Sequence, residues 1–297
     1  MTDGPRAVVV GSGAMAPEIA ACLAGTGTAV RIAGRDPGRA AAAAEAARGM
    51  AEGTGERIDA GPIDAGAFAG AALVVETILE DLEAKRELLA RIEPWCPDAT
   101  VIATNTSSLR IADLADALAR PARFAGLHFL KPAHLTGVVE VVPGPGTDDA
   151  TVAVLRGLAG QMGKAPLLVR ADEPGFIWNR IQFAVLRECL HMLEAGIADA
   201  ADIDAAVSDG LAPRWTAAGP LATADLGGLP TFARVSAQLN PYLAAGAGVS
   251  RELTARAEAG APLRPWTRDG GPAVAALRAR ALRAGREIAA ARRAIGG

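Results

Sequence analysis

Cysteine and histidine are scarce in this chain, with three of each among 297 residues. Cys22, Cys96 and Cys189 are far apart and odd in number, so they suggest neither a disulfide framework nor a Cys-x-x-Cys metal motif. The absence of both patterns predicts a reducing compartment and no metal centre. We therefore expect a cytoplasmic protein whose chemistry rests on other side chains.

Long apolar runs and an excess of positive charge are also missing. No apolar stretch reaches the ~18 residues that a membrane span needs, and residues 1–13 lack the charged start of a secretory leader. The net charge is −3. The Arg-rich residues 278–297 alternate with apolar positions at helical spacing, which favours a solvated helix face over a binding tail. We expect neither a membrane nor a nucleic acid as a partner.

A glycine pair lies between an apolar run of strand length, residues 6–10, and an alanine-rich helical pattern. The pair belongs to a Gly-x-Gly-x-x-Ala motif, the fingerprint of a dinucleotide-binding βαβ unit. Gly11 permits a tight turn, and Gly13 lets backbone N–H groups approach a pyrophosphate at the helix N-terminus. Ala16 allows close packing of helix and strand, and Ala14 and Met15 begin the helix. These five residues are predicted to bind the cofactor.

The end of the second predicted strand, residues 29–33, bears on which dinucleotide binds. An NAD site usually has Asp or Glu here, which holds the ribose 2′-OH. Gly34 occupies that place, and Arg35 and Arg39 offer guanidinium groups that suit a 2′-phosphate. These residues favour NADP. The alternative is NAD held by Asp36, although Asp36 followed by proline is also typical of a helix cap.

The order of elements predicts an α/β fold. Strands and helices alternate to about residue 142, which indicates a Rossmann-type, doubly wound, mainly parallel sheet. Residues 176–297 contain helical patterns and almost no strand-like stretch. We place the boundary near Glu173, with a dinucleotide-binding domain at 1–173 and an all-helical substrate and dimerisation domain at 174–297.

A histidine and a glutamate stand inside two neighbouring strand-like runs. His128 lies in LHFL, and Glu140 interrupts the apolar run VVEVV. A buried carboxylate without a partner is costly. Antiparallel pairing of the two runs places Glu140 where it accepts the Nδ1 proton of His128 and fixes the imidazole tautomer. Such a pair is a general acid–base arrangement; the alternative is a core histidine beside an edge-strand glutamate.

Polar residues follow two other strands of the predicted sheet. Residues 105–108, Asn-Thr-Ser-Ser, follow one strand, and Glu80 follows another. Ligands of doubly wound sheets bind at the carboxyl ends of the strands. One residue of the 105–108 cluster is expected to cap the following helix, which leaves the others for a ligand.

These motifs together resemble the 3-hydroxyacyl-CoA dehydrogenase family, including its lambda-crystallin, L-gulonate and carnitine dehydrogenase-like members. The resemblance covers almost the whole chain. It is carried by Gly-Ser-Gly-Ala-Met-Ala at 11–16, Asn-Thr-Ser-Ser at 105–108, His-Phe-Leu-Lys-Pro at 128–132, Val-Glu-Val-Val at 139–142, Pro-Gly-Phe-Ile-Trp-Asn-Arg at 174–180, and Gly-Pro-Leu with Asp-Leu-Gly-Gly-Leu at 219–229.

The resemblance implies roles for single residues. His128 is implied as the catalytic acid–base and Glu140 as its partner. Ser107 would hydrogen-bond the reacting oxygen, and Asn179 would reach in from the helical domain. Further cofactor contacts are implied for Glu80, Lys85, Asn105 and Lys131, the last standing where the family usually has asparagine.

The implied activity is hydride transfer between a nicotinamide cofactor and the 3-hydroxy group of a hydroxyacyl thioester. The segment that carries CoA contacts in typical members is short here, and residues 36–72 contain no lysine. A hydroxy acid on a carrier protein, or a free small hydroxy acid, is therefore an alternative substrate. A non-catalytic, crystallin-like dinucleotide-binding protein is the other alternative. The apolar helices of the second domain suggest a homodimer.

Overall fold

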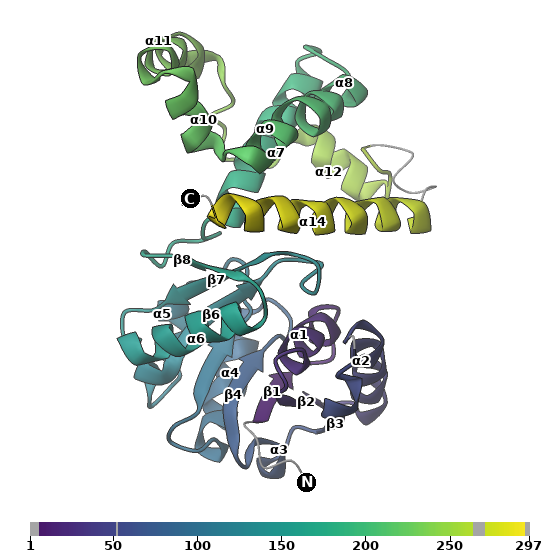
Figure 1. Ribbon diagram of the computed structural model, residues 1–297, viewed down its shortest axis with the longest axis vertical. Helices are drawn as coiled ribbons and strands as arrows, with labels where there is room; N and C mark the ends of the chain where they lie inside the picture. The colour runs from purple at the N-terminus through teal and green to yellow at the C-terminus, as the bar shows by residue number, and fades with distance from the viewer. Residues whose placement is uncertain (1–5, 52, 264–270, 295–297) are drawn as a thin grey trace. The chain divides into compact units, whose positions relative to one another are not determined.

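The computed structural model describes residues 6–51, 53–263 and 271–294. The chain forms two compact units, Met1–Asn179 and Arg180–Gly297 (Figure 1). The first unit is α/β and the second is helical, which confirms the predicted fold class. The predicted boundary between residues 173 and 174 lies close to this division. Residues 174–179 stay with the first unit because hydrogen bonds and packing around Phe176 hold them there.

One eight-stranded sheet forms the centre of the first unit. Its order is β3-β2-β1-β4-β5-β6-β7-β8, and every neighbouring pair is parallel except β6 with β7. The first six positions have the 3-2-1-4-5-6 order of dinucleotide-binding sheets. The strands are β1 (Arg6–Val10), β2 (Ala29–Gly34), β3 (Ile58–Pro62), β4 (Ala71–Glu76), β5 (Val101–Thr104), β6 (Phe124–Phe129), β7 (Val138–Pro143) and β8 (Ala165–Leu168).

Helices cover both faces of this sheet, and each face has its own apolar cluster (Figure 1). On one face lie α1 (Met15–Ala24), α2 (Pro37–Met50) and α6 (Asp149–Gln161), and on the other lie α3 (Ala65–Phe68), α4 (Leu82–Ile92) and α5 (Ile111–Ala115). Short 3₁₀ turns occur at Gly55–Arg57, Glu93–Trp95 and Pro121–Arg123. Burial on both faces explains why the central strands read as continuous apolar runs.

The strand order reverses beside β1, which is where such sheets bind ligands. After β1 the chain builds β2 and β3 on one side, then crosses to β4 on the other side. Gly11, directly after β1, and Thr77, directly after β4, are in close contact there: a Cβ on Gly11 would lie 2.9 Å from the carbonyl oxygen of Thr77. A candidate site is therefore positioned by the topology of the sheet.

The second unit consists of helices throughout its described residues. They are α7 (Trp178–Glu194), α8 (Ala200–Ala205), a π-helix (Ala206–Leu211), α9 (Ala212–Ala217), α10 (Pro220–Gly227), α11 (Leu229–Leu239), a 3₁₀ turn (Asn240–Tyr242), α12 (Arg251–Glu258) and α14 (Gly271–Ala294). Within the described part of this unit, only Leu190 and Ile203 are buried apolar residues. These helices therefore have almost no core of their own.

Candidate active site

The glycine turn after β1 has the geometry that an anionic ligand requires. Gly11 has a φ of +123°, a left-handed conformation that favours glycine. A Cβ on Gly13 would meet nothing within 4 Å, so the backbone there faces open space. Helix α1 begins at Met15, and its N-cap residue Ala14 makes no side-chain capping bond. The first N–H groups of α1 are therefore left without a side-chain cap, as a bound pyrophosphate would need.

A cleft of about 980 Å³ opens beside this turn. Its size and lining suit a dinucleotide, with the glycine turn in one part and charged side chains in another. The predicted residues Gly11, Gly13, Ala14, Met15, Arg35, Glu80, Asn105 and Ser107 line it, together with Asp36, Arg39, Glu87 and Arg91. Ala16 is fully buried and packs α1 against the sheet. The residues present thus fit a dinucleotide.

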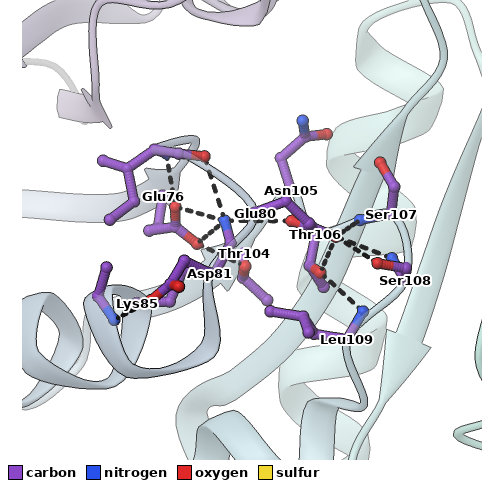
Figure 2. Close-up of polar contacts among 12 residues, drawn as sticks. Glu76, Glu80, Asp81, Lys85, Thr104, Asn105, Thr106, Ser107, Ser108 and Leu109 are labelled. Atoms are coloured by element: carbon purple, nitrogen blue, oxygen red, sulfur yellow. Dashed lines mark hydrogen bonds and ion pairs between the residues drawn. The ribbon is translucent and has the colours of Figure 1, made fainter. Parts of the chain in front are cut away.

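A buried ion pair joins Glu76, the last residue of β4, to Lys85 of α4 (Figure 2). Lys85 Nζ is 2.8 Å and 2.9 Å from the two carboxylate oxygens of Glu76. The hydroxyl of Thr104 and the backbone N–H of Ile78 also donate to Glu76, both at 2.6 Å. Lys85 is 1% exposed and its ammonium neutralises the buried Glu76 carboxylate. Direct contact of Lys85 with the cofactor stays a prediction.

Glu80 binds the turn that follows β5 (Figure 2). Its Oε1 accepts hydrogen bonds from Thr106 Oγ1 at 2.7 Å, Ser107 N at 2.7 Å, and Ser108 N and Oγ at 2.9 and 3.1 Å. Burial by itself raises the pKa of Glu80, but these bonds and the nearby Lys85 charge more than offset it, so the pKa lies below its ordinary value. Glu80 is therefore charged at neutral pH and orders the 106–108 turn.

We expect Glu80→Gln to lower kcat/KM roughly ten-fold, because charge-assisted hydrogen bonds to this turn become neutral ones. Glu83→Gln is the matched control, since Glu83 is exposed on α4 and pairs there with Arg86. Steady-state kinetics of both variants checks this. Equal kcat/KM in the two variants would show that the 106–108 turn does not depend on the Glu80 charge.

His128 and Glu140 are direct cross-strand neighbours on β6 and β7. His128 Nδ1 lies 2.6 Å from Glu140 Oε2, and the two side chains are 4% and 0% exposed. Burial alone raises the pKa of Glu140; hydrogen bonds from His128 and from the N–H groups of Trp178 and Ile177 lower it below its ordinary value. The structure thus brings together the two residues that the sequence pairs.

Asn105 joins this pair to the cleft. Its side-chain oxygen accepts from the N–H of Phe129 at 2.8 Å, directly after His128, and its own N–H donates to the carbonyl of Glu76. Asn105 therefore links the ends of β4, β5 and β6. Glu80 and Ser107 lie in the loops after β4 and β5, and His128 lies on β6.

Ser107 and Asn179 are also brought together. Asn179 Nδ2 donates to the carbonyl oxygen of Ser107 at 3.2 Å. Ser107 is thus held on its N–H by Glu80 and on its carbonyl by Asn179. Asn179 is the last residue of the first unit, although the resemblance implies that it reaches in from the helical domain. The roles of both residues in the reaction stay predictions.

Lys131 is exposed on the loop after β6 and does not line the cleft. That loop is anchored by two buried charged residues from other elements. Glu18 on α1 accepts from the N–H of Ala133, and Lys164 Nζ donates to the carbonyl oxygens of Ala133 and Thr136, both at 2.6 Å. Lys131 is therefore carried by a fixed loop, and its contact with the cofactor stays a prediction.

The expected cap of the helix at residues 111–115 is wrong. None of residues 105–108 caps α5; Thr106 instead accepts from Leu109 N, within its own turn. The cap is Asp172, whose two oxygens accept from Ile111 N at 2.8 Å and Ala112 N at 2.7 Å. A partner more than sixty residues away cannot be recognised from local spacing.

The sequence interpretation also missed Glu76, Asp172 and Phe176. A signal existed for Glu76, because a lone carboxylate ends the apolar run ALVVE, and the reasoning that pairs Glu140 applies to it equally. Phe176 lies inside the 174–180 motif, but no local pattern marks its contact with His128 or the capping role of Asp172, since both arise from contacts across the fold.

The doubly wound sheet, the glycine turn at its switch point and the cleft beside it define a dinucleotide-binding protein with a second, helical unit. The comparisons with known proteins agree. Residues 6–173 match the NAD binding domain of 3-hydroxyacyl-CoA dehydrogenase, and residues 175–260 match its C-terminal domain. The chain belongs to the 3-hydroxyacyl-CoA dehydrogenase family, which confirms the predicted resemblance.

Individual relatives differ in what they act on. A solved structure named 5-formyl-3-hydroxy-2-methylpyridine 4-carboxylic acid 5-dehydrogenase, an NAD+ dependent dismutase, is similar with a TM-score of 0.87 and 30% identity, covering 95% of this chain and 97% of that one. Mitochondrial hydroxyacyl-coenzyme A dehydrogenase of Sus scrofa is 44% identical over 138 residues, 46% of this chain and 44% of the relative. L-carnitine dehydrogenase of Streptomyces griseus is 40% identical over 162 residues, 54% of this chain and 48% of the relative.

The aligned part of the chain spans about half the length of the curated relatives it matches. Among the described residues, no helix combines the length and the apolar character that crossing a bilayer demands. Nor do those residues include a group of three or more His, Cys, Asp or Glu side chains that could hold a metal ion.

Proposed function

We propose that this protein is a nicotinamide-dependent oxidoreductase that interconverts a hydroxyl and a carbonyl group of a small hydroxy acid. The observation that carries the proposal is the buried His128–Glu140 pair, 2.6 Å apart. The pair lies in the same sheet as β1, β2, β4 and β5, and residues that follow those four strands line the dinucleotide cleft. A non-catalytic binding protein has no use for such a pair, and burying it costs free energy.

The chain's own residues would handle the proton and the oxygen of the substrate. The nicotinamide, when bound, supplies or accepts the hydride. Glu140 holds the Nδ1 proton, so that Nε2 of His128 removes the hydroxyl proton during oxidation and returns it during reduction. Ser107, whose backbone is held by Glu80 and Asn179, would hydrogen-bond the reacting oxygen through its hydroxyl. Burial of His128 and Glu140 strengthens these interactions, because water competes little there.

The region after β2 favours a free acid over a CoA thioester as the substrate, because it offers few groups that could bind CoA. The chain passes through one helix, α2, and a 3₁₀ turn directly into β3, and residues 36–72 contain no lysine for a CoA phosphate. The structural relative that covers nearly the whole chain is named for a pyridine carboxylic acid. A hydroxyacyl thioester, on CoA or on a carrier protein, is the second candidate, supported by the match to hydroxyacyl-coenzyme A dehydrogenase.

A substrate panel tests this proposal. Free β-hydroxy acids, L-carnitine, pyridine carboxylates with a hydroxymethyl or formyl group, and 3-hydroxyacyl-CoA thioesters are each supplied with NAD+ and NADP+, and reduced nicotinamide is followed by absorbance. We expect the largest kcat/KM with a free acid. A thioester preference would move the assignment to the second candidate, and no turnover with any compound despite cofactor binding would favour the non-catalytic alternative.

We also propose that NADP is preferred over NAD. Arg35 and Arg39 line the cleft at the end of β2, and Gly34 brings no carboxylate to repel a 2′-phosphate. Asp36 caps α2 through a bond from Arg39 N at 3.0 Å, which explains its presence without a ribose contact. The alternative is that Arg35 stacks on the adenine and NAD binds, as named for the structural relative.

Arg35→Ala should reduce the NADP preference in kcat/KM by roughly 10- to 150-fold, the worth of a charge-assisted contact. Arg57→Ala is the control, because Arg57 binds the carbonyl of Gly27 and does not line the cleft. A wild-type enzyme that favours NAD by ten-fold or more would leave Arg35 as a stacking residue. Creating an NAD site needs more than Gly34→Asp, since a Cβ on Gly34 would lie 2.9 Å from that of Ala40; Ala40→Gly must accompany it.

We propose that the protein is a homodimer whose interface includes the second unit. Large apolar side chains are exposed throughout the described part of that unit; Leu221 and Leu226 are 83% and 82% exposed. Helices with so little buried apolar surface need a covering partner to be stable. Light scattering after size-exclusion chromatography should give twice the chain mass of 30.1 kDa. A monomer at micromolar concentration would contradict the proposal.

A further inference from the structure

The segment formed by residues 172–178 is tied to the first unit at both ends by carboxylates. At one end, Asp172 accepts from the backbone of α5. At the other, Glu140 Oε1 accepts from Ile177 N at 2.8 Å and Trp178 N at 2.9 Å. Glu140 therefore has two duties: its Oε2 holds His128, and its Oε1 holds the segment that passes beside the histidine.

Phe176 lies between these two ties in an unfavourable backbone conformation. Within the described residues it is the only non-glycine residue with a positive φ, +50°, and it follows Gly175 at +83°. A left-handed conformation costs free energy for a bulky side chain, whereas glycine adopts it freely. The contacts of the ring must offset that cost.

The ring of Phe176 contacts His128. The two ring centroids are 5.6 Å apart with an interplanar angle of 61°, an edge-to-face arrangement. Phe176 is 2% exposed and belongs to the apolar cluster beneath α5 that also contains Val169. Glu140 holds one nitrogen of the imidazole by a hydrogen bond, and the edge-to-face contact with Phe176 adds an apolar contact to the same ring.

We propose that Phe176 is a positioning residue, which sets the plane of the His128 imidazole and thereby the direction of Nε2. The proposal rests on the acid–base role of His128 under the proposed function. It predicts a loss in kcat without a matching loss in binding, because a reacting group displaced by about 1 Å costs roughly 10²-fold in rate.

The test uses Phe176→Leu, which keeps apolar volume but has no ring, and Phe176→Gly, which also removes the backbone cost. Val169→Ala is the matched control, a loss of buried volume in the same cluster at a residue with no ring contact to His128. For each protein we would measure kcat, KM, the Kd for reduced cofactor, and the imidazole NMR signals with labelled histidine. The chain has three histidines, so His134→Gln and His191→Gln assign the His128 signals.

We expect kcat to fall by roughly 10²-fold in Phe176→Leu, with KM and Kd within a few-fold of wild type and with broadened His128 signals. Val169→Ala should keep the wild-type kcat and signals. Unchanged kcat and sharp His128 signals in Phe176→Leu would overturn the proposal, and so would equal losses in Phe176→Leu and Val169→Ala. If His128→Gln itself retained kcat, the proposed function would fail, and the NMR signals of Phe176→Leu would still decide whether the ring holds the imidazole. Phe176→Leu decides the matter alone if Phe176→Gly does not fold.

Discussion

His128→Gln is expected to lower kcat by about 10²–10⁴-fold, the usual worth of a general acid–base, while the Kd for reduced cofactor stays within a few-fold. Glutamine can accept or donate a hydrogen bond but cannot exchange a proton near neutral pH. His128 does not line the dinucleotide cleft, so its replacement should not change the Kd for the cofactor by more than a few-fold. Steady-state kinetics and cofactor fluorescence measure the two quantities separately.

His191→Gln is the matched control for this variant. His191 lies on α7 in the second unit, and its replacement should leave both kcat and Kd unchanged. A His128→Gln protein with near-normal kcat would remove His128 from the reaction. If His128→Gln also weakens cofactor binding by a large factor, His128 supports the folded structure of the site and its role is not confined to proton transfer.

Glu140→Gln is expected to lower the free energy of unfolding by about 3 kcal/mol at neutral pH, the effect of breaking a buried charged pair, and to lower kcat. The carboxylate accepts from His128, Ile177 and Trp178, and its pKa lies below the ordinary 4.5. A carboxyl whose pKa is lower in the folded state stabilises the fold at pH values above its unfolded-state pKa. This stabilisation is lost as the pH falls through its folded-state pKa. The difference between wild type and variant should therefore shrink as pH falls below about 4.5.

Glu93→Gln separates stability from catalysis. Glu93 is a buried carboxylate that accepts from the backbone of Ala119 and Arg120, both at 2.8 Å, at the opposite end of α4 from Glu80. Its replacement should destabilise the fold and leave kcat unchanged. Urea titrations at several pH values, with kinetics under native conditions, check both variants. If the difference in the free energy of unfolding between wild type and Glu140→Gln does not change with pH, the charge of Glu140 is not what stabilises the site.

The parts of the fold that local sequence determines could be predicted. The Gly-x-Gly-x-x-Ala turn, the cap at Asp36 and the apolar runs of the central strands each act over a few residues, and the structure has the turn, the cap and the strands there. The His128–Glu140 pair could be predicted as well, because a lone carboxylate in a buried strand needs a nearby partner.

Features that depend on the assembled sheet could not be predicted in the same way. Strand β3 gives little local signal, because Gly61 and Pro62 are poor strand formers. They are tolerated since β3 is an edge strand with one neighbour. The ties made by Asp172, and the contact of Phe176 with His128, join residues more than forty positions apart. Spacing along the chain carries no signal for such contacts.

Tracing the hydride tests whether the enzyme transfers it from the substrate to the nicotinamide with His128 as the acid–base group. A hydroxy acid taken from the panel, deuterated at the carbon that bears the hydroxyl, is incubated with the enzyme and oxidised cofactor, and the reduced nicotinamide is analysed by mass spectrometry. We expect the label on the nicotinamide with wild type and His191→Gln, and only in trace amounts with His128→Gln. Label that is lost to solvent, or an equal yield from the His128→Gln protein, would contradict this expectation.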